Sequence, residues 1–282
     1  MNSHKDDNTK NDTAKNDTAK NGTAQNQRAK TTKPDQVITS KDNPLFKKLK
    51  LLLSSKGIKE HKLFFLMGEK LIKEFTKTKN KKFKVHLAVC SEKYFAKYPF
   101  NTIILSQDLF NELDTLGTHF SMLVLECDDF PEADLKQPAT KVEVVLPIGD
   151  PRNMGALVRS AIGFNIDQFI LTQEACHPFL PQSVKASAGA ILKADFYTAP
   201  GKTTTLPVIG ANFALDLEGK SLQQITWPEH FRLWIGEEGP GLQTTDQQKK
   251  QFKFINIPTQ NIESLNATVS ASIAFWEIAK SK

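Results

Sequence analysis

The chain is poor in cysteine and has no long apolar run. Its three cysteines, Cys90, Cys127 and Cys176, lie far apart and form no CxxC or zinc-ligand spacing. Three cysteines cannot pair evenly, which argues against a disulfide scaffold and for a reducing compartment. No apolar run approaches the roughly 18 residues that a membrane helix needs. The polar N-terminus lacks the apolar core of a signal peptide. We therefore expect a soluble cytoplasmic protein.

Ligands for a metal ion are also missing, because the six histidines are scattered and form no cluster. The 282 residues are 39% apolar and 24% charged, an ordinary globular composition. Collagenous, mucin-like and wholly disordered chains are thereby excluded. The length predicts two modest domains, each with its own core.

Positive charge is concentrated in one segment. Residues 35–100 hold 16 lysines against 6 acidic residues, a net charge of +10, whereas residues 101–140 have a net charge of −7. Residues 141–282 are neutral overall. Lysines in the basic segment could neutralise RNA phosphates without reading bases. A solvated lysine-rich surface is the alternative interpretation.

Four stretches differ in character. Residues 1–33 carry the repeat TKNDTAKNDTAKNGTAQN with almost no apolar residues, which predicts a disordered tail. Alternating helix and strand patterns over residues 34–129 predict a small α/β domain. The polar, proline-containing residues 130–141 are the expected linker. Residues 142–282 open with the apolar VEVVLP and predict βαβ units around a mainly parallel sheet.

The patterns assign elements to both regions. In the first, we expect helices over 45–55, 69–77 and 107–116, and strands within 62–68, 85–90, 102–106 and 121–130. In the second, we expect strands within 142–150, 167–172, 206–212, 231–241 and 252–258, and helices within 156–164, 185–197 and 264–280.

Three loops after predicted strands carry special residues. In DPRNMGALVRS, Asn153 is expected to cap a helix and Arg159 to lie about one turn inside it. Both residues fit a purely structural role. Alternatively, an arginine near a capped helix start can hold a phosphate or polarise a hydroxyl.

The second loop, LWIGEEGPGL, contains Gly236, Gly239 and Gly241, which allow close backbone approach or positive φ. It matches neither GxGxxG nor a P-loop. Glu237 and Glu238 would repel phosphate, so the loop suits a neutral or cationic ligand unless it is a plain glycine-rich turn. In the third loop, polar Ser264 and Asn266 precede a helix and could be mere caps.

The segments NMGALVRS, IGEEGPGL and IPTQNIESLNATVSASI resemble, in order and spacing, the three motifs of the SpoU/TrmH family of SPOUT-class RNA ribose 2′-O-methyltransferases. The segment ITSKDNPLFKKLKLL, followed by KLFFLMGEKLIKEF, resembles that family's N-terminal RNA substrate-binding domain, to which Lys47, Lys48 and Lys50 would contribute RNA contacts. The stretch between Pro258 and Ser264 lacks the family's usual glycine. We expect Asn261 to supply its turn, because asparagine tolerates the left-handed conformation.

The resemblance implies a C-terminal domain tied in a trefoil knot, with S-adenosylmethionine bound at the knot. It implies a homodimer whose active site lies at the interface. Backbone contacts to the cofactor would come from Gly236, Ile257 and Leu265. The positions that match the family's active site are Asn153, Arg159, Glu238, Ser264 and Asn266.

The expected activity is therefore transfer of a methyl group from S-adenosylmethionine to a ribose 2′-hydroxyl, with Arg159 positioning and activating that hydroxyl. Ribosomal RNA is favoured over transfer RNA as substrate, because a separate basic N-terminal domain is common in family members that modify it. The first alternative is a catalytically silent RNA-binding protein on the same fold. The second is a nicotinamide enzyme, which the absence of GxGxxG after VEVVLP disfavours.

Overall fold

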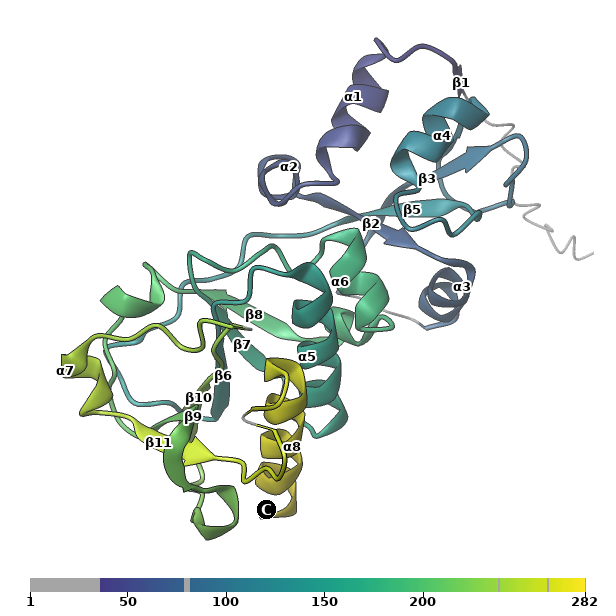
Figure 1. Cartoon of the computed structure of the whole chain (residues 1–282). Helices are drawn as coiled ribbons and strands as arrows, with labels where there is room; N and C mark the ends of the chain where they lie inside the picture. The colour runs from purple at the N-terminus through teal and green to yellow at the C-terminus, as the bar shows by residue number, and fades with distance from the viewer. Residues whose placement is uncertain (1–35, 79–81, 238, 263, 282) are drawn as a thin grey trace, which may run out of the picture. The chain divides into compact units, whose positions relative to one another are not determined.

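The computed structural model describes residues 36–78, 82–237, 239–262 and 264–281 (Figure 1). The expected tail, residues 1–33, and the expected active-site residue Glu238 lie outside these ranges. The described residues contain two β-sheets with flanking helices. None of the helices in these ranges is long and apolar enough to span a membrane.

The first sheet has five strands in the order β1-β4-β3-β5-β2. Its central strand β3 runs parallel to β4 and antiparallel to β5, and β2 is also antiparallel to β5. The strands are β1 (Gln36–Ile38), β2 (Leu63–Met67), β3 (Val85–Ser91), β4 (Thr102–Leu105) and β5 (Met122–Glu126). The helices are α1 (Pro44–Leu51), α2 (Ser55–His61), α3 (Glu69–Lys77) and α4 (Gln107–Leu113).

The second sheet has six strands in the order β11-β9-β10-β6-β7-β8, and every pairing is parallel. Its strands are β6 (Val142–Leu146), β7 (Gln168–Leu171), β8 (Asp195–Thr198), β9 (Asn212–Ser221), β10 (Phe231–Trp234) and β11 (Lys253–Asn256). The α-helices are α5 (Pro151–Gly163), α6 (Pro181–Ala186), α7 (Asp246–Lys249) and α8 (Ala267–Lys280), and short 3-10 helices cover Ala190–Lys193, Thr203–Thr205 and Leu222–Gln224. The expected α/β class with a parallel C-terminal sheet is confirmed.

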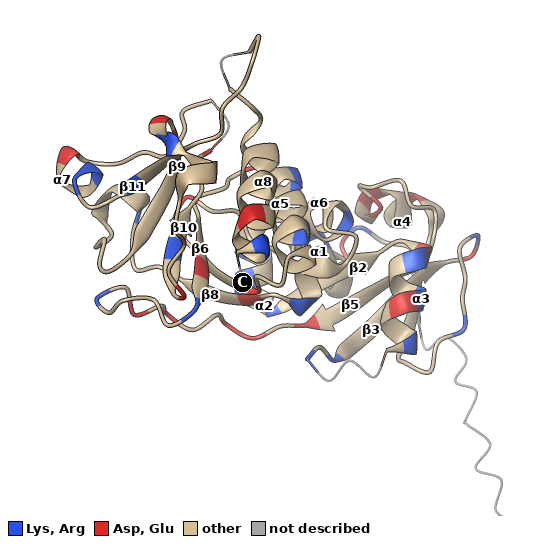
Figure 2. Ribbon diagram, turned by 90° about the horizontal axis from the view of Figure 1, so that it is seen from below, with Lys and Arg blue, Asp and Glu red and all other residues tan. Residues whose placement is uncertain are grey.

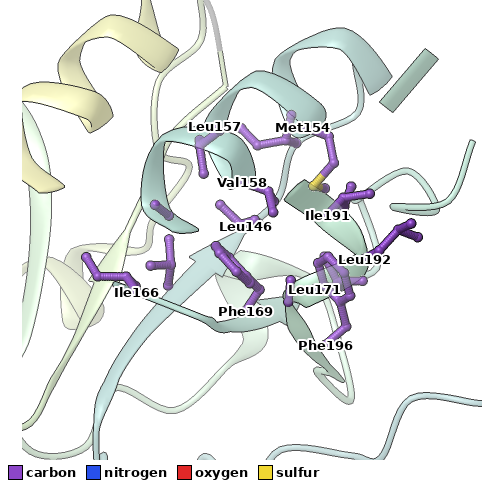
Figure 3. Packing of buried hydrophobic residues seen from close by; sticks show 14 of the residues in the cluster. Leu146, Met154, Leu157, Val158, Ile166, Phe169, Leu171, Ile191, Leu192 and Phe196 are labelled. Atoms are coloured by element: carbon purple, nitrogen blue, oxygen red, sulfur yellow. The ribbon is translucent and has the colours of Figure 1, made fainter. Parts of the chain in front are cut away.

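The core of the second region forms where α5 packs on the sheet. Met154, Leu157 and Val158 lie on one side of α5, as helical spacing requires, and are fully buried near Leu146 and Phe169 (Figure 3). On the same helix, a Cβ at position 155 would lie 2.2 Å from the Ser183 carbonyl oxygen. The glycine there allows α6 to pack closely on α5, which fixes the position of the helix that carries Asn153 and Arg159.

Some expected elements are wrong. The residues assigned to one helix within 185–197 instead form the end of α6, a 3-10 turn and β8. The helix stops because Ala188 and Gly189 adopt positive φ values of 48° and 80°. The strand expected at 206–212 is also wrong, because β9 begins at Asn212. The helix expected over 45–55 ends at Leu51, and Ser54 caps a separate α2.

Residues 130–141 are fastened to the second sheet although they lack regular structure. The Thr198 amide donates to the Pro131 carbonyl, and the Ala133 amide donates to the Thr198 carbonyl, both at 2.9 Å. Buried Arg232 donates to the carbonyl oxygens of Asp134 and Gln137. The stretch therefore begins along the edge strand β8 and continues to Arg232 on β10. The expected division into residues 34–129 and 142–282 as separate domains stays a prediction.

Candidate active site

A cavity of about 760 Å³ opens beside β9 and where β10 and β11 end. Ligands of open parallel sheets bind at this carboxyl edge. The volume lies within the range of small-molecule sites, about 300–1,000 Å³. All three residues expected to hold a cofactor line it, and they come from three segments: Gly236 after β10, Ile257 after β11 and Leu265 before α8.

The loop after β10 is tightly folded. The Glu237 amide donates to the Gly241 carbonyl at 3.2 Å, and the Gly241 amide donates back at 3.1 Å. Gly239 and Gly241 adopt φ values of 89° and 66°, which favour glycine. A Cβ on Gly236 would lie 2.3 Å from the Leu242 nitrogen, so the backbone of this loop packs directly on position 236. The glycines of LWIGEEGPGL are thus required by the shape of the cavity wall.

Glu237 joins two of the three loops. Its Oε1 accepts a hydrogen bond from the Gly149 amide at 2.8 Å, which connects the β10 loop to the turn between β6 and α5. Glu237 also lines the cavity. The sequence suggested a role for its charge, but it did not indicate this connection.

The third loop carries the expected turn. Asn261 has a φ of 64°, so the prediction that it supplies a left-handed turn here is confirmed. Ser264 and Asn266 both line the cavity. Asn266 is also the N-cap of α8, because its Oδ1 accepts from the Thr268 amide at 2.9 Å and the Val269 amide at 3.3 Å.

The start of α5 differs from the prediction. Asp150, and not Asn153, is the N-cap, since its Oδ1 accepts from the amides of Arg152 and Asn153. Ion pairing with Arg152 and these amide hydrogen bonds lower the pKa of Asp150. Asn153 lies in the first turn, and Arg159 lies about two turns into the helix rather than one.

Asn153 and Arg159 are not among the described residues that line the cavity. Six positions separate them on α5, which corresponds to about 9 Å along the helix and about 120° around it. Arg159 is exposed, and Asn153 is half-buried. A single chain therefore gathers Ser264 and Asn266 at the cavity but leaves Arg159 on the outer surface of α5.

Helices α5 and α8 lie side by side (Figure 1). Ser160 Oγ and Ser272 Oγ are 2.7 Å apart, which places the residue next to Arg159 against α8. On α8, Val269 and Trp276 are 46% and 49% exposed. They are two turns apart and so lie on one side of the helix. This apolar stripe, on the helix that packs beside α5, is suited to a protein contact.

The expected RNA-binding lysines are partly neutralised. Lys47 pairs with Asp42 at 2.8 Å, and Lys50 pairs with Glu112 at 2.6 Å. Hydrogen bonds from Lys41 and Lys50 lower the pKa of Glu112. Lys48 is half-buried. Figure 2 shows basic and acidic residues interspersed on α3 as well. The basic segment is therefore a surface of mixed charge with a lysine excess.

Two of the three cysteines are poor candidates for thiol chemistry. Cys90, Cys127 and Cys176 are all free thiols. Burial raises the pKa of Cys127 and of Cys176 to about 11, so neither is a ready nucleophile near neutral pH. Among the described residues, no three histidine, cysteine, aspartate or glutamate side chains are grouped closely enough to hold a metal ion.

Sequence reasoning missed one part of the cavity wall. Asp216 and Glu218 line the cavity from a bulge in β9. We placed no strand at these residues, so their position at the site could not be inferred. The available signal was Gly219, a glycine directly after acidic residues, which is typical of a turn or bulge.

A family model described as the SpoU rRNA methylase family matches residues 141–276, which include the whole cavity. Residues 141–276 belong to the SpoU rRNA methylase family. The predicted resemblance is thereby confirmed for this part of the chain. The three loops of the SpoU region are the three motifs on which the resemblance was recognised.

Curated relatives are similar over about half of their own length. "Ribosomal RNA small subunit methyltransferase G 2" of Syntrophobacter fumaroxidans is 30% identical over 253 residues, which cover 86% of this chain and 49% of that protein. A 23S rRNA (guanosine-2′-O-)-methyltransferase of Acinetobacter baylyi is 27% identical over 143 residues, which cover 48% of this chain and 57% of that protein.

Solved structures share the fold over most of the chain. The SpoU methyltransferase AviRb of Streptomyces viridochromogenes, in complex with the cofactor AdoMet, aligns with a TM-score of 0.67 at 18% identity. The alignment covers 84% of this chain and 97% of AviRb. An AdoMet-bound rRNA methyltransferase of Sinorhizobium meliloti aligns with a TM-score of 0.66 at 19% identity and covers 86% and 97% of the two chains.

Proposed function

We propose that this protein is an RNA methyltransferase that moves a methyl group from S-adenosylmethionine to a ribose 2′-hydroxyl. The main support is the cavity at the carboxyl edge of the second sheet. The three residues expected to hold the cofactor, Gly236, Ile257 and Leu265, line it together with two expected active-site residues, Ser264 and Asn266. The 2′-O specificity is supported by the matched relative named a guanosine-2′-O-methyltransferase.

The described residues fit this cofactor. Gly236, Ile257 and Leu265 would hold it through backbone and apolar contacts. No lysine or arginine occurs among the described residues of the cavity wall, which suits a cationic ligand. When bound, S-adenosylmethionine supplies an electrophilic methyl group on a sulfonium. The protein's part of the reaction is to exclude water and to align the attacking hydroxyl with that methyl group.

Arg159 is proposed to position and activate the ribose hydroxyl. A guanidinium stays protonated in proteins, so it acts by hydrogen bonding and charge unless a phosphate and Asn153 assist proton transfer. In one chain Arg159 is exposed on α5 and does not line the cavity. We therefore propose that a second copy docks on the α5–α8 surface and that the two chains together complete the site.

The substrate is proposed to be ribosomal RNA, with transfer RNA as the alternative. The protein is proposed to act in the cytoplasm, where free thiols persist. Residues 34–129 would hold the RNA through their lysine excess. We also propose that residues 142–282 are tied in the trefoil knot that the family resemblance implies. Mapping 2′-O-methyl sites in total RNA, with and without the gene, identifies the substrate.

Two variants test the chemistry. Arg159→Ala should abolish methyl transfer and leave the affinity for S-adenosylmethionine within about twofold, because Arg159 is proposed to act on the ribose hydroxyl and not to hold the cofactor. Arg159→Lys should not restore activity, because lysine lacks the planar fork of donors. Transfer within about threefold of wild type would remove Arg159 from the reaction. If the wild-type protein does not bind S-adenosylmethionine, the silent RNA-binding alternative replaces the enzyme.

A further inference from the structure

Strand β9 contains an unusual bulge beside the cavity. On β11, Phe254 and Ile255 are consecutive, but their partners on β9 are Ala214 and Lys220. The five residues between those partners, Leu215–Gly219, therefore leave the ladder. We call this segment the β9 bulge. Its first four residues line the cavity.

The β9 bulge is held in one shape by three local features. Asp216 Oδ1 accepts from the Glu218 amide at 2.9 Å, which closes a turn. Asn256 Nδ2 donates to the Leu217 carbonyl at 2.6 Å and ties the bulge to the end of β11. A Cβ on Gly219 would lie 2.4 Å from the Ile255 nitrogen, so the returning chain passes against β11 at a place where only glycine fits.

The charges at the cavity are of one sign. Asp216 and Glu218 on the β9 bulge and Glu237 on the loop after β10 are its charged described residues, and all three are acidic. Asp216 and Glu218 are exposed, whereas Glu237 is tied to Gly149. A carboxylate attracts a cation over several ångströms even without direct contact.

We infer that the β9 bulge selects the charged cofactor over its spent form. This inference rests on the proposed function. S-Adenosylmethionine and S-adenosylhomocysteine share the same nucleoside, ammonium and carboxylate, and they differ by the methyl group and the positive charge on sulfur. Asp216 and Glu218 therefore stabilise the bound cofactor and lose that contribution once the methyl group has gone to RNA. The product is then released more readily, and fresh cofactor replaces it.

The test compares affinities for the two ligands by calorimetry, in wild type and in the Asp216→Asn/Glu218→Gln variant. Both replacements keep side-chain size, and a thermal unfolding midpoint verifies folding. The ratio of the two affinities should shift by about fivefold toward S-adenosylhomocysteine, chiefly through weaker S-adenosylmethionine binding. Raising the salt concentration should reduce the wild-type preference, because exposed carboxylates are screened.

Glu229→Gln is the matched control. Glu229 is exposed and precedes β10, whereas the cavity opens where that strand ends, so this variant should keep the wild-type ratio. An unchanged ratio in the double variant, or equal weakening of both ligands, overturns the selective role of the β9 bulge. If wild type binds neither ligand, the proposed function itself fails.

Discussion

Replacing Gly236 with alanine should weaken cofactor binding at least about tenfold while leaving the fold intact. The added Cβ would lie 2.3 Å from the Leu242 nitrogen and 2.4 Å from the Gly241 carbonyl carbon. Ordinary contact begins at 3.4 Å, so the chain must separate there by about 1.1 Å. Both obstacles are backbone atoms, and neither can turn away as a side chain would.

The size of the expected loss of affinity follows from the cost of separating these backbone segments. Overpacking of this kind costs about 1–3 kcal/mol. Gly241 and Leu242 belong to the same cavity wall as Gly236, so the strain falls on the cofactor site. We expect affinity for S-adenosylmethionine to fall at least about tenfold, which corresponds to about 1.4 kcal/mol.

The assay is calorimetric titration together with thermal unfolding. Gly163→Ala is the matched control, because a Cβ there meets nothing within 4 Å at the end of α5. It should bind the cofactor as wild type does. Unchanged affinity in a folded Gly236→Ala protein would mean that the cofactor site lies elsewhere.

Three further predictions concern RNA, stability and pH. A variant with glutamate in place of Lys47, Lys48 and Lys50 should bind RNA more weakly, with a flatter salt dependence, and should keep its affinity for the cofactor. Deleting residues 1–33 should weaken RNA binding much less. In filter binding at several salt concentrations, normal RNA binding by the triple variant together with weak binding by the deletion would contradict the RNA-binding role of residues 34–129. Glu143→Gln should lower the free energy of unfolding by about 3 kcal/mol in urea titrations, because it leaves Arg232, 3% exposed and paired at 2.7 Å, without its counter-ion; a loss below about 1 kcal/mol would contradict this. Burial, with repulsion from Lys59 and Lys62, lowers the pKa of His177 from 6.5 to about 3. Because the unfolded chain binds this proton near pH 6.5 and the folded chain does not until about pH 3, stability should fall as the pH drops through that window, by up to about 1.4 kcal/mol per pH unit. His177→Leu should remove that component of the slope in urea midpoints between pH 7 and 5.

Elements that depend on local sequence patterns were predicted best. The helix over 69–77 has the predicted bounds, because its apolar spacing and preceding glycine are both local. The strand within 62–68 forms as β2 for the same reason. Asn261 adopts the left-handed turn that its side chain tolerates. The three loops were predicted together because the carboxyl ends of parallel strands meet at one edge.

What the sequence did not reveal depends on pairing between distant residues. The β9 bulge exists because β11 resumes its ladder at Lys220 instead of Leu215, and no local pattern encodes that register. The cap of α5 was assigned to Asn153 because both it and Asp150 are good caps, and only the position of Pro151 at the first helical residue decides between them. The fastening of Asp134 and Gln137 depends on Arg232, nearly one hundred residues later in the chain.

The placement of Arg159 gives a reason to consider two chains together. If Arg159 were only a surface charge, the exposed side chains of α8, which packs beside α5, would be expected to be polar. Instead Val269 and Trp276 leave about half of their surface exposed there. If it were catalytic within one chain, it would be expected at the cavity wall, where it is not found. The proposed second copy would remove both difficulties, because it would bury the apolar stripe and bring an arginine toward a cavity whose described charged residues are acidic. Mixing Arg159→Ala chains with Gly236→Ala chains tests this directly. At an S-adenosylmethionine concentration near the wild-type dissociation constant, Arg159→Ala alone should be inactive and Gly236→Ala alone strongly impaired. Mixed dimers should exceed both and approach half of the wild-type activity per dimer if the arginine and the cofactor come from different chains. No recovery after verified subunit exchange would place both functions in one chain.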